Sequence, residues 1–236
     1  MTINHEYFLF SPSEFAKRAI TATAQWLANP VAGFEHLRAQ VIETYSTKPD
    51  VQYLMDDFGA WTSNDLQERL FGIDAGGEED VALCLLMLVY DTLQFDKADR
   101  CYVASFFFSE FARFAEKAVW STNECNLLGE GRPFGILIDA EFNTERLPGP
   151  LFETAHRVWN MIRPETVCGS VGWLSAQDVT IMRRRLADPK TGTIASSLGN
   201  SHQDSSAYFT SMTARLANFF QVAEAKQLGA CIIISG

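Results

Sequence analysis

The chain has 236 residues, of which 47% are hydrophobic and 12% aromatic, so it has enough apolar material for one sizeable core. Eighteen phenylalanines argue against intrinsic disorder. The formal net charge of −10 argues against nucleic acid as a direct ligand, because such binding needs lysines and arginines that neutralise phosphates.

The first predicted elements are a strand and two helices. Residues 5–10 (HEYFLF) are short and aromatic-rich, which suits a strand. Residues 11–14 (SPSE) place Ser at the N-cap, Pro at the first helical position and Glu at the third, an arrangement that satisfies backbone donors at a helix start. Asn29-Pro30 ends this helix, and a second helix is predicted from Val31 to about Tyr45. The apolar side of the first helix is expected to hold Phe15, Ala19, Ala22 and Trp26.

Acidic residues are concentrated in one segment. From Glu43 to Asp99 there are thirteen acids and three bases, so this segment carries the entire net charge. Two interpretations stay open: a solvated face with helix-start acids, or a docking surface for a basic partner. The candidate partner-binding residues are Asp56, Asp57, Asp74, Glu78, Glu79 and Asp80. Short helices are expected between Lys48 and Gly77.

Residues 81–90 form an unbroken apolar run inside this segment. Ten residues are too few for a membrane span, which needs about 20, so we expect a buried helix and no membrane partner. Glu78, Glu79 and Asp80 place negative charge at its positive N-terminal end. The segment from Cys101 to Trp120 is predicted as a second strongly apolar helix, with a stripe of phenylalanines at 107, 111 and 114.

The last hundred residues alternate between helices and strands. A strand is predicted at 134–138, a loop at 143–150 and a helix at 151–162. Residues 175–178 cap a helix that ends before Pro189, and a polar loop is predicted from Ser196 to Ser206. The final helix carries apolar residues from Phe209 to Ala223, and Gly229 is expected to stop it at the C′ position. Ala230–Ser235 is predicted as a closing strand.

Taken together, these elements predict a mostly helical α+β protein whose helices pack on a small sheet that includes the N-terminal and C-terminal strands. We expect a single domain over residues 1–236, with an acidic helical insertion or subdomain at about 43–99.

The order of several short motifs is similar to that of the YfbM-like family of small bacterial proteins. The matching positions are Tyr7 to Phe15, Asp96-Lys97, Gly169, Leu174-Ser175, Asp178-Val179, Tyr208-Phe209, Phe219-Phe220, Ala223, Gly229 and Ile234-Ser235. The similarity covers about the last seventy residues continuously and the first twenty more loosely. The resemblance implies a single α+β domain and carries no activity with it.

No motif meets the requirements of a catalytic or cofactor site. In Cys168-Gly169-Ser170-Val171-Gly172 the glycine directly precedes the serine, so the G-x-S-x-G pattern is not met. The histidines at 5, 36, 156 and 202 form no metal-ligand pair, and the run 183–185 of three arginines is expected to be solvated or salt-bridged. We therefore expect no cofactor and no metal.

The cysteines and the N-terminus both favour the cytoplasm. Residues 1–15 have no basic region and only a four-residue apolar run, unlike a secretory signal. The cysteines are odd in number and have no C-x-x-C spacing, so reduced core thiols are favoured over a redox or metal role. The five positions are Cys84, Cys101, Cys125, Cys168 and Cys231.

The combined pattern predicts a non-enzymatic cytoplasmic binding protein. The most concrete form of this hypothesis is a bacterial immunity or antitoxin protein whose acidic region neutralises a basic toxin. The alternative hypothesis is a small-molecule enzyme or sensor with a pocket between the C-terminal helices and the sheet, in which the loop 196–206 forms the lip. The sequence leaves the oligomeric state open.

Overall fold

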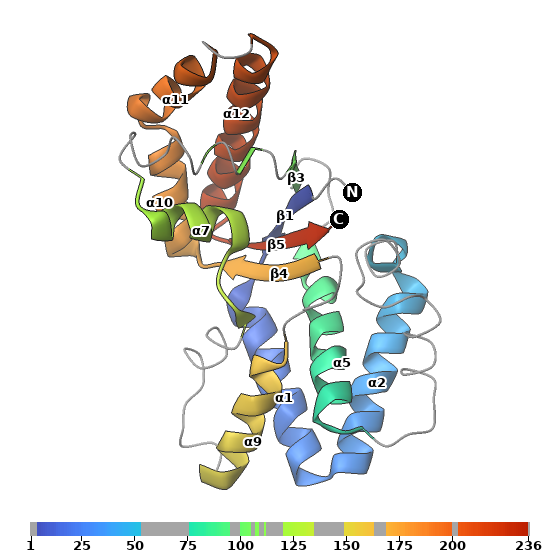
Figure 1. The fold of residues 1–236 in the computed structure, drawn as a ribbon. Coiled ribbons are helices and arrows are strands. Elements are labelled where there is room, and N and C mark those ends of the chain that lie inside the picture. The colour runs from blue at the N-terminus through green and yellow to red at the C-terminus, as the bar shows by residue number, and fades with distance from the viewer. Residues whose placement is uncertain are drawn as a thin grey trace. The chain divides into compact units, whose positions relative to one another are not determined.

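The computed structural model describes residues 4–52, 76–94, 100–104, 107–108, 111, 120–134, 149–162, 169–199 and 203–235. Within these residues the chain is a mostly helical α+β protein, as the sequence predicts (Figure 1). It divides into two compact units. The first comprises Met1–Phe10, Gln94–Gly131 and Val171–Gly236, and the second comprises Ser11–Leu93 and Arg132–Ser170. The predicted acidic insertion at 43–99 stays a prediction, because much of it lies outside the described residues.

One sheet contains the five strands of the described residues, and it joins the two ends of the chain. The strands are β1 (Asn4–Phe10), β2 (Leu93–Gln94), β3 (Arg100–Ala104), β4 (Gly169–Leu174) and β5 (Gly229–Ser235). Their order is β2-β1-β5-β4, and β3 also pairs with β1. β1 runs antiparallel to β5, from Asn4 opposite Ser235 to Phe10 opposite Gly229. The prediction that the sheet includes the first and last strands is therefore confirmed, and the structure shows that the two are neighbours.

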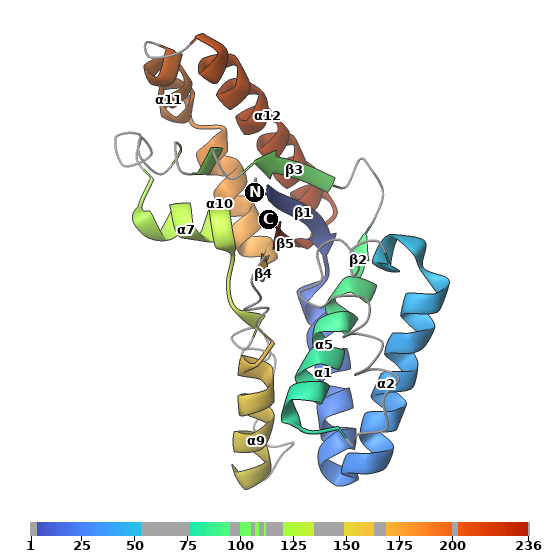
Figure 2. The same cartoon turned by 45° about the vertical axis from the view of Figure 1, so that its right-hand side comes forward.

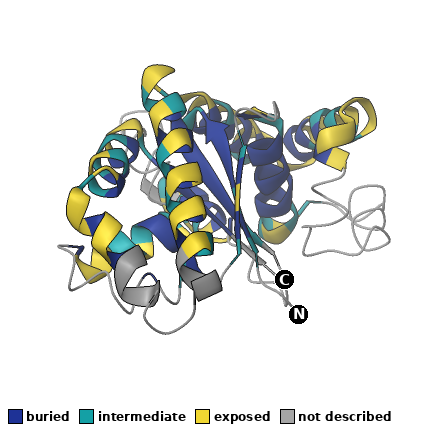
Figure 3. Cartoon of the chain, turned by 90° about the horizontal axis from the view of Figure 1, so that it is seen from above, coloured by how far each residue is buried: buried dark blue, intermediate teal, exposed yellow. Residues whose placement is uncertain are grey.

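The first unit packs helices against these strands (Figure 2). They are α7 (Thr122–Glu130), α10 (Ala176–Leu186), α11 (Pro189–Gly199) and α12 (Gln203–Ala225). α12 contacts α10, α11 and β3, while α10 and α7 contact β5. Aromatic rings fill the interior: Phe209 stacks on Phe107 with 4.7 Å between ring centroids, and Phe111 meets Trp120 edge-on at 4.8 Å. In the cartoon of Figure 3 the strands are coloured largely as buried, and the helices carry both buried and exposed residues.

The second unit is a group of helices around α5. Its members are α1 (Pro12–Ala28), α2 (Pro30–Thr47), α5 (Glu78–Asp91) and α9 (Gly149–Asn160). α5 contacts the other three, and every residue from 81 to 90 is buried, which confirms the predicted buried helix. An apolar surface around the whole helix requires neighbours on more than one side. In the part of the chain that is described, no helix combines the length and apolarity that crossing a membrane requires.

Two predicted N-caps have different outcomes. Ser175 and Asp178 form a reciprocal capping box at α10, in which Ser175 Oγ accepts from the Asp178 N–H at 3.0 Å and Asp178 Oδ2 accepts from the Ser175 N–H at 3.0 Å. Ser11 occupies the N-cap of α1, with Pro12 after it, but the Ser11 side chain makes no capping hydrogen bond, so that part of the prediction is wrong.

The predicted helix from Cys101 to Trp120 is wrong at its start, because residues 100–104 form β3. The side chains of Cys101 and Val103 are buried while Tyr102 between them is exposed, which is the two-residue period of a strand. Pairing of β3 with β1 selects this period over a helical one. The described phenylalanines at 107, 108 and 111 are helical, and Phe114 lies outside the described residues.

The structure also differs from the predicted strand at 134–138 and from the predicted loop at 196–206, where it describes these residues. Phe134 has helical backbone, contrary to the predicted strand, and residues 135–138 lie outside the described residues. The predicted loop 196–206 is largely helical, because α11 continues to Gly199 and α12 begins at Gln203. Packing between α11 and α12 outweighs the weak helix propensity of Ser, Asn and Gly. The alternative hypothesis placed the lip of a ligand pocket in this loop. Residues 196–199 and 203–206 are helical, so they do not form such a loop.

The end of α12 differs from the prediction that Gly229 stops the helix. The helix ends at Ala225, and Gln227 takes the left-handed conformation with φ of 56°. The N–H of Leu228 bonds the Ala223 carbonyl, and the N–H of Gln227 bonds the Glu224 carbonyl, each at 3.0 Å. This is the Schellman arrangement, with Gln at the position usually held by Gly. Gly229 instead begins β5.

Replacing Gln227 by glycine should stabilise the protein. A non-glycine residue in the left-handed region carries a steric cost, so we expect Gln227→Gly to raise the free energy of unfolding by about 0.5–1 kcal/mol. Urea unfolding followed by tryptophan fluorescence measures this. Gln221→Gly at an exposed position inside α12 is the matched control and should lower stability by about 1 kcal/mol. Destabilisation by both substitutions would contradict the assigned role of Gln227.

Removal of β5 should prevent folding of the first unit. Ala230, Cys231, Ile232 and Ile233 are buried. An isoleucine side chain contributes roughly 1.5–3 kcal/mol when removed from water. We expect a chain that ends after Gly229 to be insoluble on expression, whereas a chain that lacks only Gly236 should remain soluble. A folded, soluble chain ending at Gly229 would show that β5 is peripheral.

Candidate partner-binding surface

The N-terminus of α5 presents three of the predicted partner-binding residues on successive positions. Gly77 is the N-cap, with extended backbone, and Asp80 Oδ2 accepts a hydrogen bond from the Gly77 N–H at 3.1 Å. Because a carboxylate in the first turn also interacts favourably with the helix dipole, Asp80 stabilises the start of this buried helix. Its first role is therefore structural.

Glu78 pairs with an arginine from another helix of the same unit. Arg157 of α9 donates from Nη2 to Glu78 Oε1 at 2.8 Å and from Nε to Oε2 at 3.3 Å, a two-point contact. The hydrogen bond from Arg157 lowers the pKa of Glu78, and the same bond raises the pKa of Arg157. Arg157 is exposed, and ion pairs at the surface contribute little to stability because water screens them. The pair orients Glu78 more than it stabilises the fold.

Glu79 is the member of the trio that is exposed and that has no partner among the described residues. Glu43 at the end of α2 and Asp50 just beyond it are exposed as well. Asp56, Asp57 and Asp74 lie outside the described residues, so their assignment stays a prediction. The carboxylate whose position best fits a docking role is thus Glu79.

Asp91 shows that part of the acidic segment is used inside the protein. Its carboxylate accepts from Arg18 of α1 at 2.6 Å and from Lys48, and only 10% of its side chain is exposed. Burial acts to raise the pKa of Asp91, but the hydrogen bonds from Lys48 and Arg18 outweigh it and hold the pKa below its usual value. The resulting stabilisation is present above the unfolded pKa and is lost as pH falls through the folded pKa.

The basic run 183–185 divides as the sequence predicts. Arg183 pairs with Glu224 of α12, and Arg185 donates to Glu124 of α7 at 2.7 Å, whereas Arg184 is exposed. Two of the three arginines therefore bind helices of the first unit together. The structure assigns them a packing role, which fits the salt-bridged interpretation.

The described cysteines are free thiols, as predicted, and Cys168 lies outside the described residues. Burial, with Asp80 nearby, raises the pKa of Cys84 to about 12. Burial also raises the pKa of Cys101 to about 12 and that of Cys231 well above its usual value. Thiols with such values are inert near neutral pH. The described part of the chain contains no group of three metal-ligating side chains close enough to hold an ion.

Sequence reasoning missed Arg157 as the partner of Glu78, and Arg18 and Lys48 as the partners of Asp91. The first pair is separated by 79 residues and the Lys48–Asp91 pair by 43. No spacing rule along one helix connects residues so far apart. The sequence shows only that this part of the chain contains cations as well as carboxylates, which does not tell which of them form pairs.

Comparison with models of protein families, with curated proteins and with solved structures finds no match to this chain. The resemblance to the YfbM-like family therefore stays a prediction.

Alanine substitutions should separate the structural acids from the exposed one. Asp80→Ala removes a hydrogen bond and a charge at the start of α5, so we expect it to lower the free energy of unfolding by about 1 kcal/mol. Glu79→Ala removes neither a cap nor a pair and should change stability by less than about 0.5 kcal/mol. Thermal and urea unfolding measure both. Equal losses in the two variants would refute the division of roles.

Proposed function

We propose that this chain is a non-enzymatic binding protein that captures a basic protein through its acidic segment, Glu43 to Asp99. The observation that carries the proposal is the confinement of the whole net charge of −10 to that segment. Exposed carboxylates at Glu43, Asp50 and Glu79 support it, because they are accessible to a partner in the described part of the segment.

A toxin that acts on nucleic acid fits the chemistry of such a partner. An enzyme that binds phosphates must itself be cationic at its binding surface, so an acidic protein can cover that surface and block access. Complementary charge also accelerates encounter, which matters for an inhibitor that must act before its target does harm. We therefore propose, most concretely, an immunity or antitoxin protein that works in the cytoplasm.

A genetic test addresses the biological role. A gene for a basic toxin immediately upstream would supply the partner, and co-expression of this chain should restore the growth of cells that produce the toxin. A chain in which Glu79, Asp56 and Asp57 are all changed to Lys should protect less. Failure of the unchanged chain to protect, at a verified soluble level, would refute the proposal for that partner.

A binding-rate test addresses the surface itself. Glu79→Lys reverses a charge without removing the Asp80 cap or the Glu78–Arg157 pair, so the fold should be kept. The lysine opposes the helix dipole at the start of α5 and should lower stability by about 0.3–1 kcal/mol. We expect its association with the toxin to be roughly fivefold slower at low salt, with the difference shrinking at physiological salt. The double variant Asp56→Lys/Asp57→Lys should slow association further. Surface plasmon resonance measures the rates.

The matched control for this test is Glu130→Lys. It makes the same charge change at an exposed position of α7, outside the acidic segment. Its association rate should stay close to that of the unchanged chain. Equal slowing by Glu79→Lys and Glu130→Lys would point to total charge instead of a docking surface, and unchanged rates in all variants would refute the acidic surface.

A further inference from the structure

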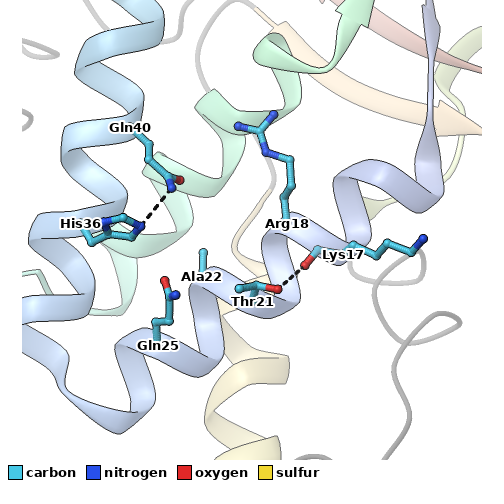
Figure 4. Close-up of a pocket in the computed structure, with 7 residues that line it drawn as sticks. All are labelled: Lys17, Arg18, Thr21, Ala22, Gln25, His36 and Gln40. Atoms are coloured by element: carbon cyan, nitrogen blue, oxygen red, sulfur yellow. Dashed lines mark hydrogen bonds between the residues drawn. The ribbon is translucent and has the colours of Figure 1, made fainter.

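A groove lies between α1 and α2 in the second unit, away from any residue that the sequence marked as functional. Figure 4 shows Arg18, Ala22 and Gln25 of α1 on the side of that helix toward His36 and Gln40 of α2. The groove has a volume of about 240 Å³. This is below the roughly 300–1,000 Å³ of pockets for drug-sized ligands, so its size suits a small metabolite or ion.

The side chains that line the groove are rich in hydrogen-bond donors and include no carboxylate. The lining consists of Lys17, Arg18, Thr21, Ala22, Gln25, His36 and Gln40. Arg18 supplies a guanidinium with five N–H groups, and Gln25 and Gln40 supply amide N–H groups. Thr21 donates its hydroxyl to the Lys17 carbonyl at 2.8 Å, so it offers its oxygen only as an acceptor.

The charged side chains that line the groove are cations, Lys17 and Arg18, even though the protein as a whole is acidic. Arg18 and Lys48 both contact Asp91, so two cations share one carboxylate and this cluster keeps a net positive charge. Lys17 adds a further cation at the rim, where its side chain extends away from α2 in the view of Figure 4. A guanidinium fixed by a carboxylate on one edge presents its remaining donors in a set orientation.

The α2 side of the groove is also held in place. Gln40 Nε2 and His36 Nε2 are 3.1 Å apart, one helical turn from each other on the same face (Figure 4). When the amide donates, the imidazole accepts at Nε2 and carries its proton on Nδ1. The described structure gives the Gln25 side chain no partner. Donors from two helices therefore line one concave surface.

We propose that this groove binds a small oxyanion, a carboxylate or a phosphate group, with Arg18 as the charged donor and Gln25 and Gln40 as neutral donors. Planar guanidinium groups match the oxygens of both anions, and charge-assisted bonds of this type are the stronger ones. The residues that line the groove all lie outside the acidic segment Glu43 to Asp99, so anion binding and capture of a basic partner can be tested separately.

The test uses the full chain with two probes, inorganic phosphate and malonate, each compared with sodium chloride at the same ionic strength. Binding to the folded state alone stabilises the protein by an amount set by ligand concentration over Kd, so the melting temperature should rise with the anion and not with chloride. Isothermal titration calorimetry then gives the affinity. The probe that binds more tightly shows whether the groove prefers a phosphate group or a carboxylate.

Three variants locate the site. Gln25→Ala and Gln40→Ala leave the Asp91 cluster intact and should each weaken binding roughly threefold to tenfold, as the loss of one hydrogen bond predicts. Arg18→Gln should weaken it by tenfold or more, and its melting curve without anion shows the separate cost of losing the Asp91 contact. Arg184→Gln, which removes an exposed arginine in the first unit, is the control and should bind as tightly as the unchanged chain.

Each outcome decides the proposal. Saturable binding that Gln25→Ala and Gln40→Ala weaken and Arg184→Gln does not supports it. Absence of binding for both anions at millimolar concentration refutes it. Binding that none of the three groove variants changes refutes it as well, because the anion then binds elsewhere.

Discussion

The antiparallel pairing of β1 with β5 is the constraint on which the first unit depends. It joins residues 4–10 to residues 229–235, so these hydrogen bonds close a loop that contains nearly the whole chain. Closing so long a loop has an entropic cost, and the burial of both strands offsets it. Tyr7, Phe8, Leu9 and Phe10 are fully buried, as are Ala230 to Ile232. Such a pair cannot be a marginal edge of the sheet.

Two polar side chains of β1 also bind backbone carbonyls of α7. The His5 ring nitrogen Nδ1 lies 2.8 Å from the Gly129 carbonyl, and the Tyr7 hydroxyl donates to the Leu128 carbonyl. Burial lowers the pKa of His5 and raises the pKa of Tyr7, which keeps both groups neutral near pH 7. The last carbonyls of a helix have no partner within it, so two buried side chains of the strand satisfy carbonyls that would otherwise be costly to bury.

In both units a buried tryptophan donates its indole N–H to the hydroxyl of a threonine. Trp120 donates its indole N–H to Thr191 Oγ1 at 3.0 Å, and Thr191 donates to the Arg185 carbonyl. In the second unit Trp159 donates to Thr23 Oγ1 at 2.9 Å, and Thr23 donates to the Ala19 carbonyl. A buried tryptophan needs an acceptor, and a threonine that already bonds a backbone carbonyl presents its oxygen without leaving its own proton unpaired.

The sequence allows prediction of features whose cause is local or strongly periodic. The strands at residues 5–10 and 230–235, the buried helix at 81–90 and the cap at Ser175 are of this kind. It does not allow prediction of β3, because pairing with β1 decides between strand and helix for these residues. It also does not allow prediction of the left-handed conformation of Gln227, because the glycine that usually marks this position stands two residues later. The ion pairs of Glu78 and Asp91 were beyond prediction for the same reason, since their partners come from other helices.

These partners change what the acidic composition means. Counting charges along the segment treats every carboxylate as available, whereas Asp91 is held between two cations and Asp80 closes the first turn of α5. Glu78 is half-buried and pairs with Arg157. Within the described residues of the segment, Glu43 and Glu79 are exposed carboxylates outside these contacts. The negative field of this segment is therefore weaker than its net charge suggests, and Arg18 and Lys48 leave a local excess of positive charge around Asp91.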